Sequence, residues 1–83
     1  MTPSDTPSTN TIFLRGDHIT LAQAVKAAGL AGSGGQAKHL VCEGTVTVNG
    51  ATETRPGRKL MPGDHFRVGE DAEWTIVAAE AGG

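Results

Sequence analysis

Large and reactive side chains are scarce in this sequence of 83 residues. It contains no tyrosine, one tryptophan, two phenylalanines and one cysteine, and 11 of its hydrophobic residues are alanine. A chain of this size buries only about 60% of the surface that it exposes when unfolded. We therefore expect one small domain without a roomy catalytic cleft, which binds through its surface and is not an enzyme.

Signals for membrane insertion, export and metal binding are missing as well. No apolar run approaches the ~20 residues that span a bilayer, and residues 1–10 lack a basic stretch followed by an apolar one. Cys42 has no partner for an internal disulfide, and His18, His39 and His65 are too far apart for a metal-ligand motif. We expect a cytoplasmic protein with no metal, no cofactor and no membrane partner.

Charge is distributed unevenly along the chain, whose net charge is −2. Residues 33–69 carry five Lys or Arg against three Asp or Glu, whereas residues 70–83 carry four acids and no base. The net charge alone argues against a nucleic-acid partner. The local counts restrict any anionic partner to the middle of the chain.

Two helix signals follow one another closely. Each starts with a hydroxyl residue and a glutamine three positions later, the pattern of a capping box, in which each side chain satisfies a backbone donor. Each ends at a glycine, which suits the left-handed residue after a helix. The apolar residues between recur at helical spacing. The sequence thus predicts a first helix over residues 20–28, with Thr20 and Gln23 at its start and Gly29 after its end. It predicts a second helix over residues 34–43, with Ser33 and Gln36 at its start and Gly44 after its end.

After the second helix the hydrophobic period changes from 3.6 to 2, which indicates strands. Val46 and Val48 alternate with threonines, and Asn49-Gly50 is a strong signal for a two-residue hairpin turn. The same alternation predicts further strands at residues 11–15, 65–68 and 73–77, the last two paired with each other.

The composition of the two ends sets the domain boundaries. Residues 1–10 are rich in Ser, Thr and Pro, so we expect a disordered tail there and a flexible tail at residues 79–83. Residues 11–78 form an α+β domain, with two short adjacent helices packed on a small, mostly antiparallel sheet. We expect Trp74 to anchor its core and Cys42 to be a small buried core residue, because a helix C-terminus disfavours a reactive thiolate.

Two clusters of residues suit an anionic ligand. At the start of the second helix, glycines, unpaired N–H groups and the helix dipole favour an anion. This cluster comprises Ser33, Gly34, Gly35, Gln36, Lys38 and His39. The second cluster, Arg55, Arg58 and Lys59, lies in a turn that Pro56-Gly57 holds, and clustered cations suit phosphate contact. Each cluster taken alone is also compatible with ordinary solvated side chains.

The segment from Ile19 to Val68 carries motifs of a known family. In order they are Ala27-Ala28-Gly29-Leu30, Ser33-Gly34-Gly35-Gln36-Ala37-Lys38, Glu43-Gly44-Thr45-Val46-Thr47-Val48-Asn49-Gly50 and Glu53-Thr54-Arg55. Together they resemble the S4-like RNA-binding domain, or alpha-L motif, which is named after ribosomal protein S4. The resemblance is greatest to the small stand-alone bacterial proteins of the YbcJ type.

The resemblance implies a binding module for structured RNA, either ribosomal or transfer RNA, with the ribosome as a candidate partner. We also expect the protein to be a monomer. Carried over by position, its RNA-binding residues would be Ser33, Gly34, Gly35, Gln36, Lys38, His39, Asn49, Arg55, Arg58 and Lys59. Lys26, on the first helix, would lie away from this surface. Many members have arginine at the position of Gly34, so this chain offers fewer cations and weaker binding is expected.

Two other functions fit parts of the sequence. The terminal Gly82-Gly83 is similar to that of ubiquitin-like sulfur carriers, whose diglycine is activated as an acyl adenylate. The fold of those carriers begins with a hairpin and then a helix, whereas here two helices follow one strand. A protein-binding adaptor that keeps the fold without binding RNA is the other alternative.

Overall fold

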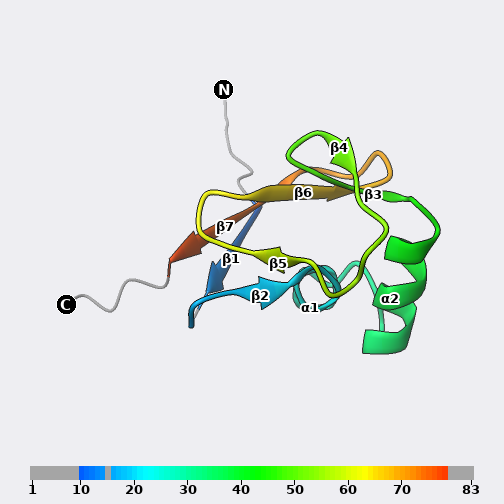
Figure 1. The fold of residues 1–83 in the computed structure, drawn as a ribbon, viewed down its shortest axis with the longest axis horizontal. Coiled ribbons are helices and arrows are strands. Elements are labelled where there is room, and N and C mark those ends of the chain that lie inside the picture. Colours follow the sequence, from blue (N-terminus) through cyan, green and yellow to red (C-terminus); the bar gives the residue numbers. More distant parts are fainter. Residues whose placement is uncertain (1–9, 15, 79–83) are drawn as a thin grey trace, which may run out of the picture.

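The computed structural model describes residues 10–14 and 16–78 and has the expected α+β architecture (Figure 1). Its elements are β1 (Asn10–Leu14), β2 (Ile19–Thr20), α1 (Leu21–Ala27), α2 (Gly34–Cys42), β3 (Val46–Val48), β4 (Ala51–Thr52), β5 (Lys59–Leu60), β6 (His65–Val68) and β7 (Trp74–Ala78). Apart from Asn10, the two predicted tails lie outside the described residues. Within the described part, neither helix has the length and apolar character needed to cross a membrane.

Five strands form one sheet in the order β1-β7-β6-β3-β4, and β2 pairs with β5 in a second, two-stranded sheet. β1 and β7 are parallel, and every other pair is antiparallel. This confirms the prediction of a mostly antiparallel sheet with β6 paired to β7. The sequence did not predict β2 and β5, because strands of two residues are too short to show a period.

The predicted caps define the first helix. The hydroxyl of Thr20 accepts a hydrogen bond from the N–H of Gln23 at 3.2 Å, and the Gln23 side chain accepts one from the Thr20 N–H at 3.1 Å. At the other end Gly29 has a φ of 79°, and the N–H of Leu30 reaches back to the carbonyl of Val25 at 3.2 Å. Both features are those that the sequence predicts for a capping box and a left-handed stop.

The second capping box is only half formed. The Ser33 hydroxyl accepts a hydrogen bond from the N–H of Gln36, as predicted, but Gln36 Oε1 accepts one from the N–H of Gly32 at 2.8 Å instead of from Ser33. A Cβ atom added at Gly32 would lie 3.2 Å from this oxygen, so the missing side chain makes room for the contact. The prediction of a reciprocal pair is therefore wrong for the second helix.

The core lies between the sheet and the two helices. Its largest fully buried side chains are Phe66, Leu21, Leu60, Ile76, Val25, Val41 and Val46. Trp74 is only partly buried and packs against this cluster from its edge, so Phe66 holds the central place expected of Trp74. Cys42 is exposed, and its predicted burial is wrong. The reason is the helical turn of about 100° per residue, which carries Cys42 off the face of its buried neighbour Val41.

The predicted Asn49-Gly50 turn provides a test of the fold. Asn49 has a φ of 51° and Gly50 a φ of 86°, the positive values of a type I′ turn. We expect Gly50→Val to destabilise the domain by roughly 1–2 kcal/mol, because a Cβ atom disfavours this conformation. Thermal unfolding followed by circular dichroism measures the loss.

Gly57→Val is the matched control for this substitution. Gly57 lacks a positive φ, and a Cβ atom added there would meet no described atom within 4 Å. This variant should melt close to the parent. Equal melting temperatures for Gly50→Val and Gly57→Val would contradict the assigned turn.

Candidate functional site

The start of α2 is open to an approaching ligand. The carbonyl of Ser33 accepts the N–H of Ala37 at 3.0 Å and its hydroxyl accepts that of Gln36, which leaves the first N–H groups of the helix, those of Gly34 and Gly35, without a helical acceptor. A Cβ atom added at Gly34 would meet no described atom within 4 Å. The positive end of the helix is therefore accessible to an anion.

A groove adjoins this helix start and separates the helices from the loop after β4. It is lined by Thr20, Ala22, Gln23, Lys26, Gly34, Lys38, Pro56 and Gly57. Gly34 and Lys38 thus line the same groove as Pro56 and Gly57 of the loop, a proximity that the sequence predicts. Lys26 also lines the groove, and the expectation that it lies elsewhere is wrong. It follows Ala22 by one helical turn on the same face of α1, and the N–H of Ala22 bonds to the loop at Pro56.

The basic loop forms a second hollow next to the groove. Arg55, Gly57, Arg58 and Lys59 line it, and Gly57 belongs to both. The first N–H groups of α1 hold this loop in place: Leu21 donates to the carbonyl of Arg58 at 2.8 Å, and Ala22 to that of Pro56 at 3.1 Å. The backbone of the loop is therefore held against the start of α1 by these hydrogen bonds.

A buried acid lies behind the loop. Glu53 is 7% exposed, and its Oε1 accepts a hydrogen bond from Nη1 of Arg58 at 2.9 Å. Its Oε2 accepts two more, from Nε of Arg55 at 3.1 Å and from the Arg55 backbone N–H at 3.0 Å. Hydrogen bonds from Arg55, and then from Arg58, lower the pKa of Glu53 to about 2. The acid is therefore ionised at neutral pH and pairs with two of the predicted RNA-binding residues.

Sequence reasoning counted Arg55 and Arg58 as cations and overlooked Glu53. The only local signal was an acid within five residues of two arginines, which is common on solvated surfaces. What decides its burial is the hydrogen bond from its own N–H to the carbonyl of Val46 at 3.0 Å, which holds Glu53 next to β3. That contact depends on the hairpin and is not visible in residues 53–58 alone.

Besides Ser33, Arg55 and Arg58, three more predicted site residues have partners within the fold. Asn49 Nδ2 donates to Asp64 at 3.2 Å, and Asn49 Oδ1 accepts the N–H of His65 at 3.1 Å. Asn49 therefore lies at the end of β3 that is farther from α2, outside the groove. His39 pairs with Glu43 at 2.9 Å, one turn along α2. The Gln36 amide is used by Gly32, as described above. These three side chains therefore have partners within the fold. In the part of the chain that the structure describes, no ion pair involves Lys38 or Lys59.

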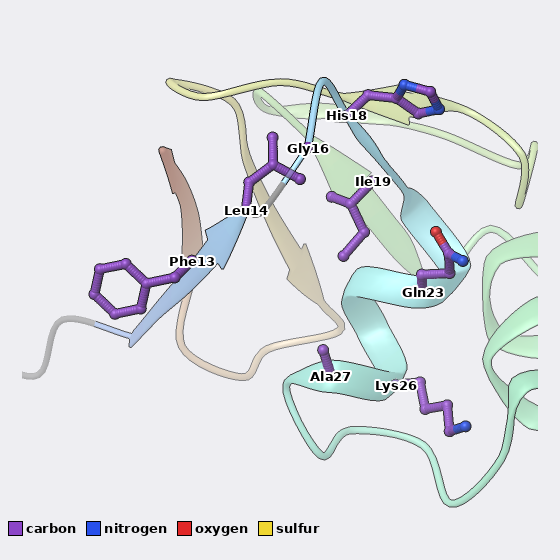
Figure 2. A pocket seen from close by; sticks show the side chains of 8 residues that line it. All are labelled: Phe13, Leu14, Gly16, His18, Ile19, Gln23, Lys26 and Ala27. Atoms are coloured by element: carbon purple, nitrogen blue, oxygen red, sulfur yellow. The ribbon is translucent and has the colours of Figure 1, made fainter. Parts of the chain in front are cut away.

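A further hollow lies between β1 and α1 (Figure 2). Its walls comprise Phe13, Leu14, Gly16, His18, Ile19, Gln23, Lys26 and Ala27. Figure 2 shows the Phe13 ring turned away from α1 and the Lys26 side chain pointing away from β1. The walls are largely apolar, and the described lining shares only Gln23 and Lys26 with the groove. The groove and the loop are therefore the candidate region for an anion.

Cations are concentrated on this region. We define the basic face as Lys26, Lys38, Arg55, Arg58 and Lys59, which line the groove and the adjoining hollow. These are five of the seven Lys and Arg residues of a chain whose net charge is −2. The negative net charge therefore does not exclude a polyanionic partner, because binding depends on the local density of cations and not on the average charge.

Comparison with known sequences gives the family of the chain. The S4 domain family matches residues 12–77 of this chain. The "Probable ribosome maturation protein RlbA" of Bacillus subtilis is 44% identical over 68 residues, which cover 82% of this chain and 96% of that protein. The "Putative RNA-binding protein YbcJ" of Escherichia coli is 44% identical over 46 residues, or 55% of this chain and 66% of that protein.

Proposed function

The chain belongs to the S4 domain family, and we propose that it binds structured RNA through phosphate contacts from the basic face. The observation that carries this proposal is the meeting of Lys26, Lys38 and the open start of α2 in one groove, beside the loop cations. Phosphate contacts supply most of the salt-dependent affinity of such proteins. Residues Ser33, Gly34 and Gly35 would add backbone N–H donors at the helix start.

The proposed target is a folded RNA, recognised by shape. Double-stranded RNA offers phosphates and 2′-hydroxyls at fixed spacing, and proteins read it largely without contacting base edges. Single-strand binders instead need aromatic side chains on which bases stack. The basic face contains none, and the Phe13 ring, which is 67% exposed, lies on β1 outside the groove. The two relatives are a probable ribosome maturation protein and a putative RNA-binding protein, which makes ribosomal RNA the first candidate, with transfer RNA next.

The sulfur-carrier alternative has no support in the fold. Two strands precede α1, but they do not form a hairpin, because β1 pairs with β7 and β2 pairs with β5. Gly82-Gly83 lies outside the described residues. A protein-binding adaptor remains the competing function, and the experiment below separates it from RNA binding.

We predict that binding of a ribosomal RNA hairpin falls with salt and depends on Lys38. With three or four phosphates neutralised, log K should fall against log salt with a slope on the order of −2 to −4. Lys38→Glu should weaken binding roughly tenfold and reduce the slope by about one. Fluorescence anisotropy titrations at several salt concentrations measure both quantities.

Arg67→Glu is the matched control, since it changes the net charge equally. Arg67 is exposed on β6 between the buried residues Phe66 and Val68, so it lies on the sheet face opposite the core. Its reversal should cost far less affinity than that of Lys38. Equal losses would refute the assigned surface, and no binding to ribosomal or transfer RNA at low salt would favour the adaptor.

A further inference from the structure

Glu53 combines features that a purely structural acid does not need. It is a buried carboxylate in a chain with few large side chains, and it lies directly behind the most cationic loop of the molecule. We infer that Glu53 is a positioning residue that fixes Arg55 and Arg58 for folded RNA and thereby makes binding selective against unstructured RNA. The inference rests on the proposed RNA-binding function.

The geometry leaves the arginines able to bind while they are held. A guanidinium has five N–H donors, and each arginine gives one of them to Glu53, through Nε of Arg55 and Nη1 of Arg58. The side chains are 79% and 36% exposed, respectively. Most donors of both groups therefore stay available for phosphate oxygens.

Holding the arginines removes a cost that binding would otherwise carry. A free arginine loses side-chain conformational entropy when it is immobilised by a ligand. Here the two ion pairs at 2.9 and 3.1 Å limit that freedom before any ligand arrives. The loop backbone is fixed as well, because the carbonyl of Arg58 accepts the N–H of Leu21. Both guanidinium groups thus have set positions relative to the groove.

Fixed cations favour a ligand with fixed charges. A folded RNA presents phosphates at constant spacing and gains from a preorganised surface, whereas a flexible strand can adapt to mobile side chains and gains less. Glu53 also cancels one of the two arginine charges, which lowers nonspecific attraction to any polyanion. Positioning and partial neutralisation therefore both raise the ratio of affinity for folded RNA to affinity for unstructured RNA.

The test is Glu53→Gln, measured with a ribosomal RNA hairpin and with oligouridine of equal length at several salt concentrations. We expect oligouridine to bind about two- to threefold more tightly, with a salt slope steeper by up to about 0.7. The hairpin should bind at least about fivefold more weakly, because the arginines lose their set positions. The selectivity ratio should therefore fall about tenfold or more.

Glu73→Gln is the matched control, since it removes one negative charge from a side chain that is 52% exposed and pairs with His65. Neither Glu73 nor His65 lines the groove or the hollow of the loop. It should change binding of both RNAs by the same small factor and leave the ratio unaltered. A Glu53→Gln variant that also keeps the ratio would overturn the inference while leaving RNA binding intact. A wild-type protein that binds neither RNA would overturn both proposals.

A second variant covers the case in which Glu53→Gln does not fold by circular dichroism. Glu53→Asp keeps the charge but is shorter by one methylene, so it cannot reach both arginines as Glu53 does. We expect lower selectivity without the gain in oligouridine affinity. Unchanged selectivity in a folded Glu53→Asp protein would overturn the positioning role.

Discussion

Reversing both lysines of the groove, in the double variant Lys26→Glu/Lys38→Glu, is expected to lower the affinity for a ribosomal RNA hairpin about a hundredfold or more. The two side chains line the same groove as Gly34, so the substitution turns attraction into repulsion on both sides of the helix start. The slope of log K against log salt should become shallower by about two, because two phosphate contacts are removed. Anisotropy titration at low salt, where residual binding is measurable, gives the affinity.

The stability of the double variant has to be checked, because Lys26 lies in the last turn of α1. A cation there is favoured by the helix dipole, and replacing it with an acid costs about 0.3–1 kcal/mol. A melting temperature only a few degrees below that of the parent is therefore expected. An affinity within threefold of the parent would mean that RNA contacts another surface.

Phe66→Ala is expected to unfold the protein. Phe66 is fully buried at the centre of β6, and truncation of a buried phenylalanine costs about 3–5 kcal/mol. Small domains have total stabilities of about 5 kcal/mol at the low end of the usual range. Circular dichroism and urea titration at 25 °C should show a largely unfolded or strongly destabilised protein.

Phe13→Ala provides the same chemical change at an exposed position. Phe13 is 67% exposed on β1, so its truncation removes little buried surface. The free energy of unfolding of this variant should lie within about 1 kcal/mol of that of the parent. Similar urea midpoints for Phe13→Ala and Phe66→Ala would show that the core is not centred on β6.

Local patterns predicted what depends on neighbours in the sequence. The cap of α1 is made by residues three apart, and the hairpin turn by two adjacent residues, so short motifs were sufficient. The same reasoning identified Lys38 at the groove. The half-formed cap at Ser33 was not predicted, because the Gln36 side chain can accept from the N–H of Gly32 or from that of Ser33. The geometry of the turn before the helix decides between these two donors.

The remaining errors involve contacts between distant segments. The burial of Glu53 depends on β3, and the place of Lys26 depends on the loop that bonds to Ala22. Trp74 begins β7 and is paired with Phe66, which lies on β6, the middle strand of the sheet, and is the more buried of the two. Periodicity reports which face of an element is apolar, but not which element covers it.

The position of β7 between β1 and β6 has a consequence for the order of folding. Among the described residues β1 pairs only with β7, in the register Asn10↔Trp74 to Leu14↔Ala78. Of the described strands, the first to be synthesised therefore has no neighbour in its sheet until the last has been made. Such a long-range closure is slow compared with formation of the helices and the hairpin. During translation we expect residues 10–14 to wait unpaired while the segments of the basic face, all within residues 20–59, have already been made.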